Sequence, residues 1–289
     1  MPVLIVARVY HVNGKSDNMD ADYRGSAHHH MAKQPSKHAG PRQPKSEGAT
    51  LIFGIHAVEA ALRNARRPIR RLLLTDNAAL RLADALRARG ISADRVLPRD
   101  LDRRLGPDTV HQGALLETEP LPEAQLSDLA RTDAEHKGPL LVLDHVTDPH
   151  NVGAVLRSAA VFGASGLIMT RRHSPPLSGA LAKSASGALE MVTVLLVQNL
   201  ARAMQELKDL GFRCIGLEAS ARDRLEDEEL SGAVAIVLGA EGRGLRQLTR
   251  ESCDRLCRIE ASGPLDSLNV SNAAAVALHL AAMSRRRAR

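Results

Sequence analysis

Five continuous apolar runs in the second half of the chain constrain its fold most strongly. They lie at 140–144, 166–169, 192–197, 214–217 and 233–238. An unbroken apolar run is typical of a parallel strand that is buried on both faces of its sheet. The stretches between the runs, such as 152–162 and 200–210, have the apolar spacing of helices. Strands that alternate with helices predict an α/β sheet, with ligand groups at the carboxyl ends of its strands.

A smaller α/β unit is expected before this sheet. In chain order we expect an apolar run at 51–54, a helix at 56–62, a strand at 70–75, a helix at 80–89 ended by Gly90, a strand at 93–97 and an apolar segment at 111–116. The predicted domains are a disordered basic arm at 1–48, a small α/β domain at 49–119, a proline-marked linker at 120–138 and a larger α/β domain at 139–289. The last of these ends in an Ala-rich helix at 270–284.

Composition narrows the classes of function. Aromatic residues make up 2% of the chain and Trp is absent, so the core is expected to consist of Leu, Val, Ile and Ala. Nucleic-acid sites built on stacked aromatic side chains are excluded for the same reason. The formal net charge of +6 favours a polyanionic partner. No run of 18 or more apolar residues occurs, so we expect no membrane span.

The three cysteines indicate a reducing compartment. An odd number of cysteines in a long chain argues against a disulfide framework, and we expect a cytoplasmic protein. Cys253 and Cys257 have the i, i+4 spacing that would place both on one helix face. A zinc site needs two further ligands nearby, and the sequence offers none, so no metal is expected.

Core packing does not explain three polar stretches, at 144–153, 238–245 and 265–272. A purely structural interpretation makes Asp148 or Asn151 the cap of a helix that carries Arg157, and Asn269 or Ser271 the cap of the last helix. The glycines at 239–244 would form a flexible turn with one charged residue. Capping does not account for all the polar side chains of the third stretch. The first stretch also suits a phosphate, because a helix N-terminus presents unpaired N–H groups.

These residues carry a resemblance to a known family. Residues 148–153 with Arg157, then 238–242, then 267–271 resemble the three motifs of the SpoU (TrmH-like) RNA ribose 2′-O-methyltransferases, in order and spacing. Residues 53–58 and 111–113 are similar to the small ribosomal-protein-like substrate-binding domain of the subgroup that methylates a guanosine in 23S rRNA. The resemblance covers about residues 51–284.

The resemblance implies a SPOUT-type catalytic domain with a C-terminal trefoil knot, and a homodimer formed through that domain. It also implies S-adenosyl-L-methionine as the cofactor, contacted at Gly239, Ile259 and Leu268. The implied partner is 23S rRNA, whose phosphates the basic arm and the arginines at 285–289 would contact. The arginines at 63, 66, 67, 70 and 71 form the densest basic cluster of the ordered chain, and we predict that they contact RNA.

The implied catalytic residues are Arg157, Asn151, Glu241, Ser267 and Asn269. A guanidinium is protonated at all ordinary pH values, so Arg157 is interpreted first as a phosphate clamp and hydroxyl orienter, and second as the base. Asn151 would fix the substrate backbone or Arg157 itself, and Glu241 would pair with that arginine or order its loop. Two other interpretations stay open: a tRNA ribose 2′-O-methyltransferase, and a non-catalytic RNA-binding assembly factor of the same fold.

Overall fold

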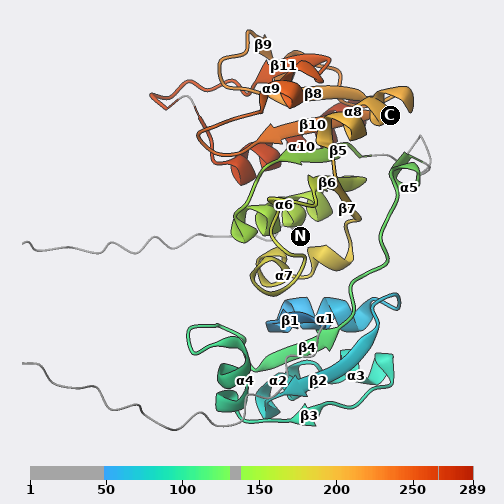
Figure 1. The fold of residues 1–289 in the computed structure, drawn as a ribbon, viewed down its shortest axis with the longest axis vertical. Coiled ribbons are helices and arrows are strands. Elements are labelled where there is room, and N and C mark those ends of the chain that lie inside the picture. The colour runs from blue at the N-terminus through green and yellow to red at the C-terminus, as the bar shows by residue number, and fades with distance from the viewer. Residues whose placement is uncertain (1–48, 131–137, 266, 289) are drawn as a thin grey trace, which may run out of the picture. The chain divides into compact units, whose positions relative to one another are not determined.

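The computed structural model describes residues 49–130, 138–265 and 267–288 (Figure 1). All of them belong to one compact unit, Ser46–Arg289. The predicted basic arm at 1–48 and Arg289 lie outside the described residues.

The first part of this unit contains a four-stranded sheet, which we call the N-terminal lobe. Its elements are β1 (Thr50–Phe53), α1 (Ile55–Arg63), β2 (Ile69–Leu74), α2 (Asp76–Arg81), α3 (Ala83–Arg89), β3 (Asp94–Arg95), α4 (Pro98–Leu105) and β4 (Ala114–Thr118). The strand order is β1-β4-β2-β3, with β4 antiparallel to both of its neighbours. Buried residues of α1 and α3 cover one face of the sheet, and Leu101 of α4 packs on the other.

Two features of the lobe differ from the expectations. The helix predicted at 80–89 is two helices, and the first begins earlier because the Thr75 side chain caps it by accepting a hydrogen bond from the Ala78 amide. Helix α4 was not predicted, since Leu101 is its one buried residue and the remainder is mostly charged. Gly90 ends α3 in the left-handed conformation, as expected.

The second part of the unit is built on a seven-stranded sheet (Figure 1). Its elements are α5 (Leu126–Ala130), β5 (Leu140–Asp144), α6 (Pro149–Phe162), β6 (Gly166–Thr170), α7 (Gly179–Ala185), η1 (Ala188–Glu190), β7 (Val194–Val197), α8 (Leu200–Asp209), β8 (Arg213–Leu217), β9 (Asp223–Arg224), η2 (Leu225–Asp227), β10 (Val234–Gly239), α9 (Gln247–Glu251), β11 (Arg255–Arg258) and α10 (Val270–Arg287). The strand order is β7-β6-β5-β10-β8-β11-β9, and every neighbouring pair is parallel. The predicted parallel α/β sheet is therefore confirmed.

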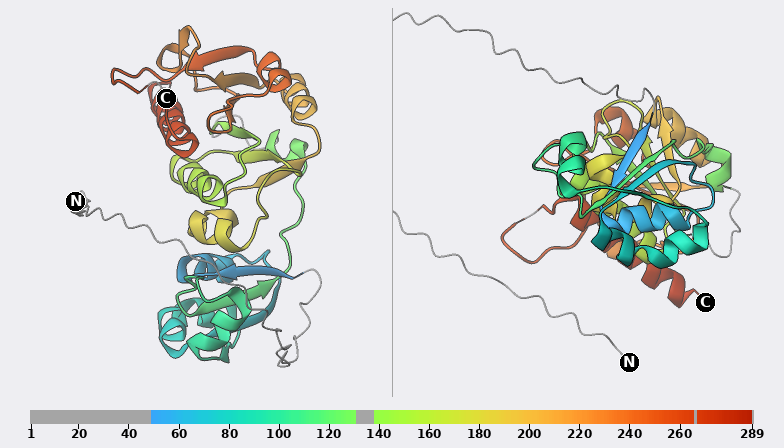
Figure 2. Two further views of the ribbon diagram at one scale, coloured as in Figure 1. Left: turned by 60° about the vertical axis from the view of Figure 1, so that its left-hand side comes forward. Right: turned by 90° about the horizontal axis from the view of Figure 1, so that it is seen from below.

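Both faces of this sheet are covered by helices, as the continuous apolar runs predict (Figure 2). Along β5, Leu140 and Val142 pack with the buried side chains of α8, whereas Leu141 and Leu143 pack with those of α6 and α10. Since all the strands are parallel, β5, β10 and β11 end at the same side of the sheet. We call this side the carboxyl edge.

The catalytic sheet and the last helix differ from the sequence-based expectations in three respects. Strands β9 and β11 were missed because Cys257 is the only buried residue in either of them. Cys253 and Cys257 share no helix face, since Cys253 follows α9 and Cys257 lies in β11. Helix α10 continues past 284 to Arg287, and the Arg285 guanidinium donates to the carbonyl of Phe162.

The three thiols provide a test of how tightly this core is packed. Burial raises the pKa of Cys214 to about 11, of Cys253 to about 12 and of Cys257 to about 11. Because the thiolate is the reactive species, we expect all three to react with an aromatic disulfide reagent at pH 8 far more slowly in the folded protein than in urea. Rapid reaction of the folded protein would show that the packing around β8 and β11 opens readily.

Candidate functional site

The predicted site residues Asn151, Glu241 and Asn269 come together at the carboxyl edge. Asn151 lies in the first turn of α6, whose start is capped by the Asp148 carboxylate through the His150 amide at 3.0 Å. Glu241 lies in the loop after β10, and Asn269 caps α10. They meet because β5 and β10 are adjacent parallel strands and α10 packs on α6.

Direct hydrogen bonds join these three side chains, which we call the Asn–Glu–Asn cluster. The Asn151 amide donates to Glu241 Oε1 at 2.9 Å. The Asn269 amide donates to Asn151 Oδ1 at 3.1 Å and also to Glu241 Oε1. Asn269 Oδ1 accepts from the Ser271 amide at 2.8 Å and from its hydroxyl at 2.6 Å. Asn269 is therefore both a helix cap and a member of the cluster. The capping interpretation of the third stretch is thus compatible with a place for Asn269 in the site.

The loop that carries Glu241 is held by close backbone contacts. A Cβ at Gly239 would lie 2.1 Å from the carbonyl carbon of Gly244, so only glycine fits there. Gly242 and Gly244 have positive φ values of 74° and 64°, and the Gly244 amide donates to the Ala240 carbonyl at 2.8 Å. The sequence alone allows a flexible turn for these glycines, and the family resemblance implies a cofactor contact at Gly239. In the structure, the backbone that approaches Gly239 is that of the loop itself.

An ion pair with a buried carboxylate anchors the other end of the same loop. The carboxylate of Asp144, at the end of β5, is fully buried and accepts from the backbone amide of Arg246 at 2.9 Å and from its Nε at 2.6 Å. Sequence reasoning assigned no role to this pair, although a carboxylate directly after a buried strand is the signal that could have found it. Next to it, burial lowers the pKa of His145, whose ring contacts that of His173 at a centroid separation of 4.6 Å and a tilt of 39°.

Arg157 does not join the Asn–Glu–Asn cluster. It lies six residues after Asn151 on α6, which at about 100° per residue places the two side chains on different faces of the helix, about 120° apart. Arg157 is exposed and lines an open hollow of the surface together with Ser158, Val161 and Phe162. The structure therefore separates this residue from the other predicted catalytic groups of the same chain.

The remaining predicted site residues lie along the carboxyl edge. Gly239 is the last residue of β10, and Ile259 follows β11 and packs against the core. Ser267 and Leu268 precede α10, and Leu268 is 49% exposed. Three separate chain segments thus bring the predicted cofactor contacts to one side of the sheet.

The two segments of the N-terminal lobe that carry the family resemblance, residues 53–58 and 111–113, contact each other and have structural roles. Gln112 Oε1 accepts from the Ile55 amide at 3.0 Å, at the start of α1. The His111 ring contacts the Asp102 carboxylate at 3.0 Å and accepts from the Gly113 amide. A Cβ at Gly113 would lie 2.2 Å from the Thr75 hydroxyl oxygen, which explains the glycine.

The predicted RNA-contacting arginine cluster needs one correction. Arg67 is 2% exposed and pairs with Glu190, so it cannot contact RNA in this structure. Its neighbours Arg63, Arg70 and Arg71 are exposed, each beside a carboxylate. Exposed pairs of this kind are weak, and RNA phosphate can compete for the arginines.

Within the described residues, no group of three or more His, Cys, Asp or Glu side chains is arranged to hold a metal ion. Among the helices described, none has both the length and the apolar character that crossing a membrane requires.

Comparison with known families gives two matches along the chain. The model of the SpoU rRNA Methylase family matches residues 138–279. A model described as RNA 2′-O ribose methyltransferase substrate binding matches residues 51–124.

Curated relatives and solved structures agree with these matches. The 23S rRNA (guanosine-2′-O-)-methyltransferase RlmB of Vibrio cholerae is 40% identical over 240 residues, which cover 81% of this chain and 97% of the relative. The enzyme of the same name from Escherichia coli is 38% identical over 240 residues, or 81% and 98% of the two chains. The SpoU methyltransferase AviRb of Streptomyces viridochromogenes has a similar fold, with a TM-score of 0.70 at 24% identity over 84% of this chain and 91% of its own. That protein has also been solved in complex with the cofactor AdoMet, and this structure matches with a TM-score of 0.70 at 22% identity, over 83% and 92% of the two chains.

Proposed function

Since this chain belongs to the SpoU rRNA Methylase family, we propose that it transfers a methyl group from S-adenosylmethionine to the ribose 2′-hydroxyl of a guanosine in 23S rRNA. The chain is thus an RNA 2′-O-methyltransferase that uses S-adenosylmethionine. The observation that carries the choice of residues is the Asn–Glu–Asn cluster, which joins the three polar stretches at the carboxyl edge.

The carboxyl edge offers apolar side chains that suit S-adenosylmethionine. Leu265 and Leu268 are 78% and 49% exposed just before α10, so both are free to contact an apolar part of the cofactor. The partly buried Ile259 adds a third apolar side chain. We propose that Gly239, Ile259 and Leu268 hold the cofactor. When bound, it supplies a methyl group on a sulfonium, which is a good leaving group.

With such a leaving group, the protein mainly aligns the ribose hydroxyl and helps it lose its proton. Asn151 and Asn269 carry the amide groups nearest to Glu241, and their hydrogen bonds fix the start of α6 and the start of α10 relative to each other. We assign them, with Ser267, to orienting the ribose and its neighbouring phosphate. Glu241 holds the two asparagines, rather than pairing with Arg157.

Arg157 is assigned to the substrate phosphate and to the 2′-hydroxyl. A guanidinium has a pKa above 12, so it donates hydrogen bonds and does not accept a proton at neutral pH. Its exposed position on α6, away from the Asn–Glu–Asn cluster, leaves it accessible to RNA. In this proposal the hydroxyl proton leaves as the methyl group is transferred, and it passes to water by way of the clamped phosphate.

A homodimer through the catalytic domain is part of the proposal. Val161 is 77% exposed on α6 beside Arg157 and Phe162, and it offers apolar surface that a second copy could cover. A second copy that covered this face of α6 would bury Val161 and bring Arg157 to the subunit interface. Arg157 would then be able to serve the cluster of the partner, from which it is separated within one chain.

We further propose the division of labour and the topology that the family suggests. Residues 49–119 would bind RNA, 120–138 would link the lobes, and 139–289 would bind the cofactor and form the C-terminal trefoil knot. Because ribosomal RNA is the proposed substrate and the relatives are bacterial, the cytoplasm is the proposed compartment.

Mapping 2′-O-methyl groups in the ribosomal RNA of cells that lack this protein tests the proposal. We expect one guanosine of 23S rRNA to lose its methyl group, and a plasmid-borne wild-type gene to restore it. Loss of a tRNA mark instead would favour the tRNA alternative. Unchanged methylation of both RNAs would contradict the enzymatic assignment.

A further inference from the structure

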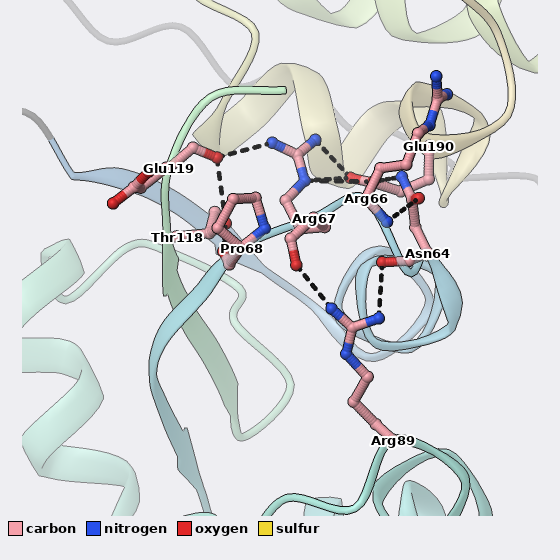
Figure 3. A network of polar contacts seen from close by, with 8 residues as sticks. All are labelled: Asn64, Arg66, Arg67, Pro68, Arg89, Thr118, Glu119 and Glu190. Carbon is pink, nitrogen blue, oxygen red and sulfur yellow. Dashed lines mark hydrogen bonds and ion pairs between the residues drawn. The ribbon is translucent and has the colours of Figure 1, made fainter. Parts of the chain in front are cut away.

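A buried ion pair joins the N-terminal lobe to the catalytic domain. Arg67, in the turn between α1 and β2, contacts Glu190 of η1, and the two side chains are 2% and 4% exposed (Figure 3). Arg67 Nη2 donates to Glu190 Oε1 at 2.6 Å, and its Nε lies 3.1 and 3.2 Å from the two carboxylate oxygens. The contact is the bidentate arrangement that fixes both distance and orientation.

Further hydrogen bonds from the lobe converge on the same two residues. The Asn64 amide donates to Glu190 Oε2 at 2.7 Å, and Arg67 Nη1 donates to the carbonyl of Glu119 at 3.0 Å. Glu119 directly precedes the predicted linker. Arg67 therefore contacts both the residue between the lobe's last strand and the linker, and the catalytic domain.

The turn that carries Arg67 is itself held rigid. Arg89, at the end of α3, donates to the backbone carbonyls of Asn64 and Arg67 at 3.0 and 2.8 Å (Figure 3). It also donates to the carbonyl of Ala65 at 3.3 Å. Carbonyls at a helix end lack partners within the helix, so a guanidinium that binds them stabilises the turn. The position of the Arg67 side chain thus depends on the fold of the lobe and not on a mobile loop.

Close packing surrounds the pair. A Cβ at Gly187 would lie 2.7 Å from the Cβ of Ala60 on α1, so α1 and the residues before η1 touch without space between them. Ala188 and Leu189 of η1 are each 4% exposed. One continuous apolar cluster includes side chains of α1, α6 and α7, and hence of both domains.

We propose that Arg67 and Glu190 are positioning residues that fix the RNA-binding lobe relative to the carboxyl edge and thereby select the nucleotide that is methylated. This inference rests on the proposed function. The lobe would hold the RNA at one place and the Asn–Glu–Asn cluster would accept a ribose at another. The distance between the two places then determines which ribose reaches the cofactor.

The energetics of buried ion pairs explain why the Arg67–Glu190 pair would orient the lobe and add little to the stability of the fold. A buried pair gains little over apolar residues of the same volume, because desolvation offsets the attraction between the charges. Apolar residues, however, have no preferred direction, whereas the Arg67–Glu190 contact allows one orientation. Replacing the pair with apolar residues therefore separates the two roles.

The test compares the double variant Arg67→Met/Glu190→Leu with the single variant Arg67→Lys. The double variant keeps the volume and removes the directional contacts, whereas Arg67→Lys keeps a charge and loses the bidentate geometry. Both are assayed with protein-free 23S rRNA and S-adenosylmethionine for kcat, KM and the position of the methyl group. Calorimetry measures S-adenosylmethionine binding, and X-ray scattering in solution measures the radius of gyration.

We expect the double variant to fold and to bind S-adenosylmethionine normally, while kcat/KM on 23S rRNA falls about 10- to 100-fold, as misplacement of a substrate allows. We also expect methylation at neighbouring nucleotides and a larger radius of gyration. Arg67→Lys should give a smaller loss. The matched control is Arg202→Met/Glu206→Leu, which removes an exposed pair on α8 and should change none of these quantities.

A folded double variant that methylates the same single nucleotide with an unchanged KM would overturn the inference. If the double variant does not fold, Arg67→Lys carries the test by the same readouts. Failure of the wild-type protein to methylate 23S rRNA would instead refute the proposed function, so the two failures are distinguishable.

Discussion

Arg157→Ala is expected to lower the rate of methyl transfer to 23S rRNA by about 100-fold or more, the usual cost of removing a group that stabilises developing charge. Arg157 is exposed and lies away from the predicted cofactor contacts, so folding and S-adenosylmethionine binding should stay unchanged. The loss arises because the substrate phosphate and the 2′-hydroxyl would no longer be held by a fixed positive charge. Single-turnover assays with tritiated cofactor measure the rate, and calorimetry measures cofactor binding.

Arg157→Lys separates the phosphate clamp from the base. If Arg157 is a clamp, lysine keeps the charge and should restore part of the rate without a new pH dependence. If it is the base, the rate of the lysine variant should rise as pH approaches the ordinary lysine pKa of about 10.4. Arg202→Ala, an exposed arginine on α8, is the matched control and should be neutral. Near-normal transfer by Arg157→Ala would refute the central assignment.

The second large effect is expected for Glu241→Ala. Glu241 Oε1 accepts from both Asn151 and Asn269, so its removal leaves two amides without their shared acceptor. We expect kcat to fall about 100- to 1,000-fold, because removing one preorganised hydrogen-bond donor from a site typically lowers kcat by that factor. Glu241 holds two such donors in place. The free energy of unfolding should change by less than about 1 kcal/mol, since the carboxylate is exposed.

Glu241→Gln sharpens this prediction. A glutamine oxygen can accept the same two hydrogen bonds, so a role in holding the asparagines predicts that most activity returns. A role for the negative charge itself predicts that the glutamine variant is as impaired as the alanine variant. Glu206→Ala, on the exposed face of α8, is the control. Full activity of Glu241→Ala would show that the Asn–Glu–Asn cluster does not serve the reaction.

The catalytic sheet was predictable because burial on both faces leaves an unbroken apolar run in the sequence. Each of the five runs corresponds to a strand of the parallel sheet. The short strands β9 and β11 at one end of the sheet could not be predicted in this way, since they hold only one buried residue, Cys257, among several charged ones. Helix α4 has the same difficulty, because only Leu101 is buried in it.

The site was partly predictable for a related reason. Polar residues placed directly after buried strands share the carboxyl edge, so the meeting of Asn151 and Glu241 follows from the parallel order of β5 and β10. The separation of Arg157 from Asn151 follows from helical geometry, but a list of motif residues does not reveal it.

Long-range pairing was beyond sequence reasoning. Arg67 lies in a run of arginines that suggests an RNA-binding surface, yet it is the member whose partner lies 123 residues away. Nothing in the local pattern distinguishes it from Arg66 or Arg70. Only the fold shows that one arginine of this run is buried in the interior.

The most direct test of the account is methyl transfer in a purified system. Wild-type protein is incubated with unmodified 23S rRNA and tritiated S-adenosylmethionine. One portion of the RNA is digested to nucleosides to identify the labelled residue, and another portion is used to map its position. The account predicts that the label appears as 2′-O-methylguanosine at a single position. Label on a base, label at many positions, or no label at all would contradict it.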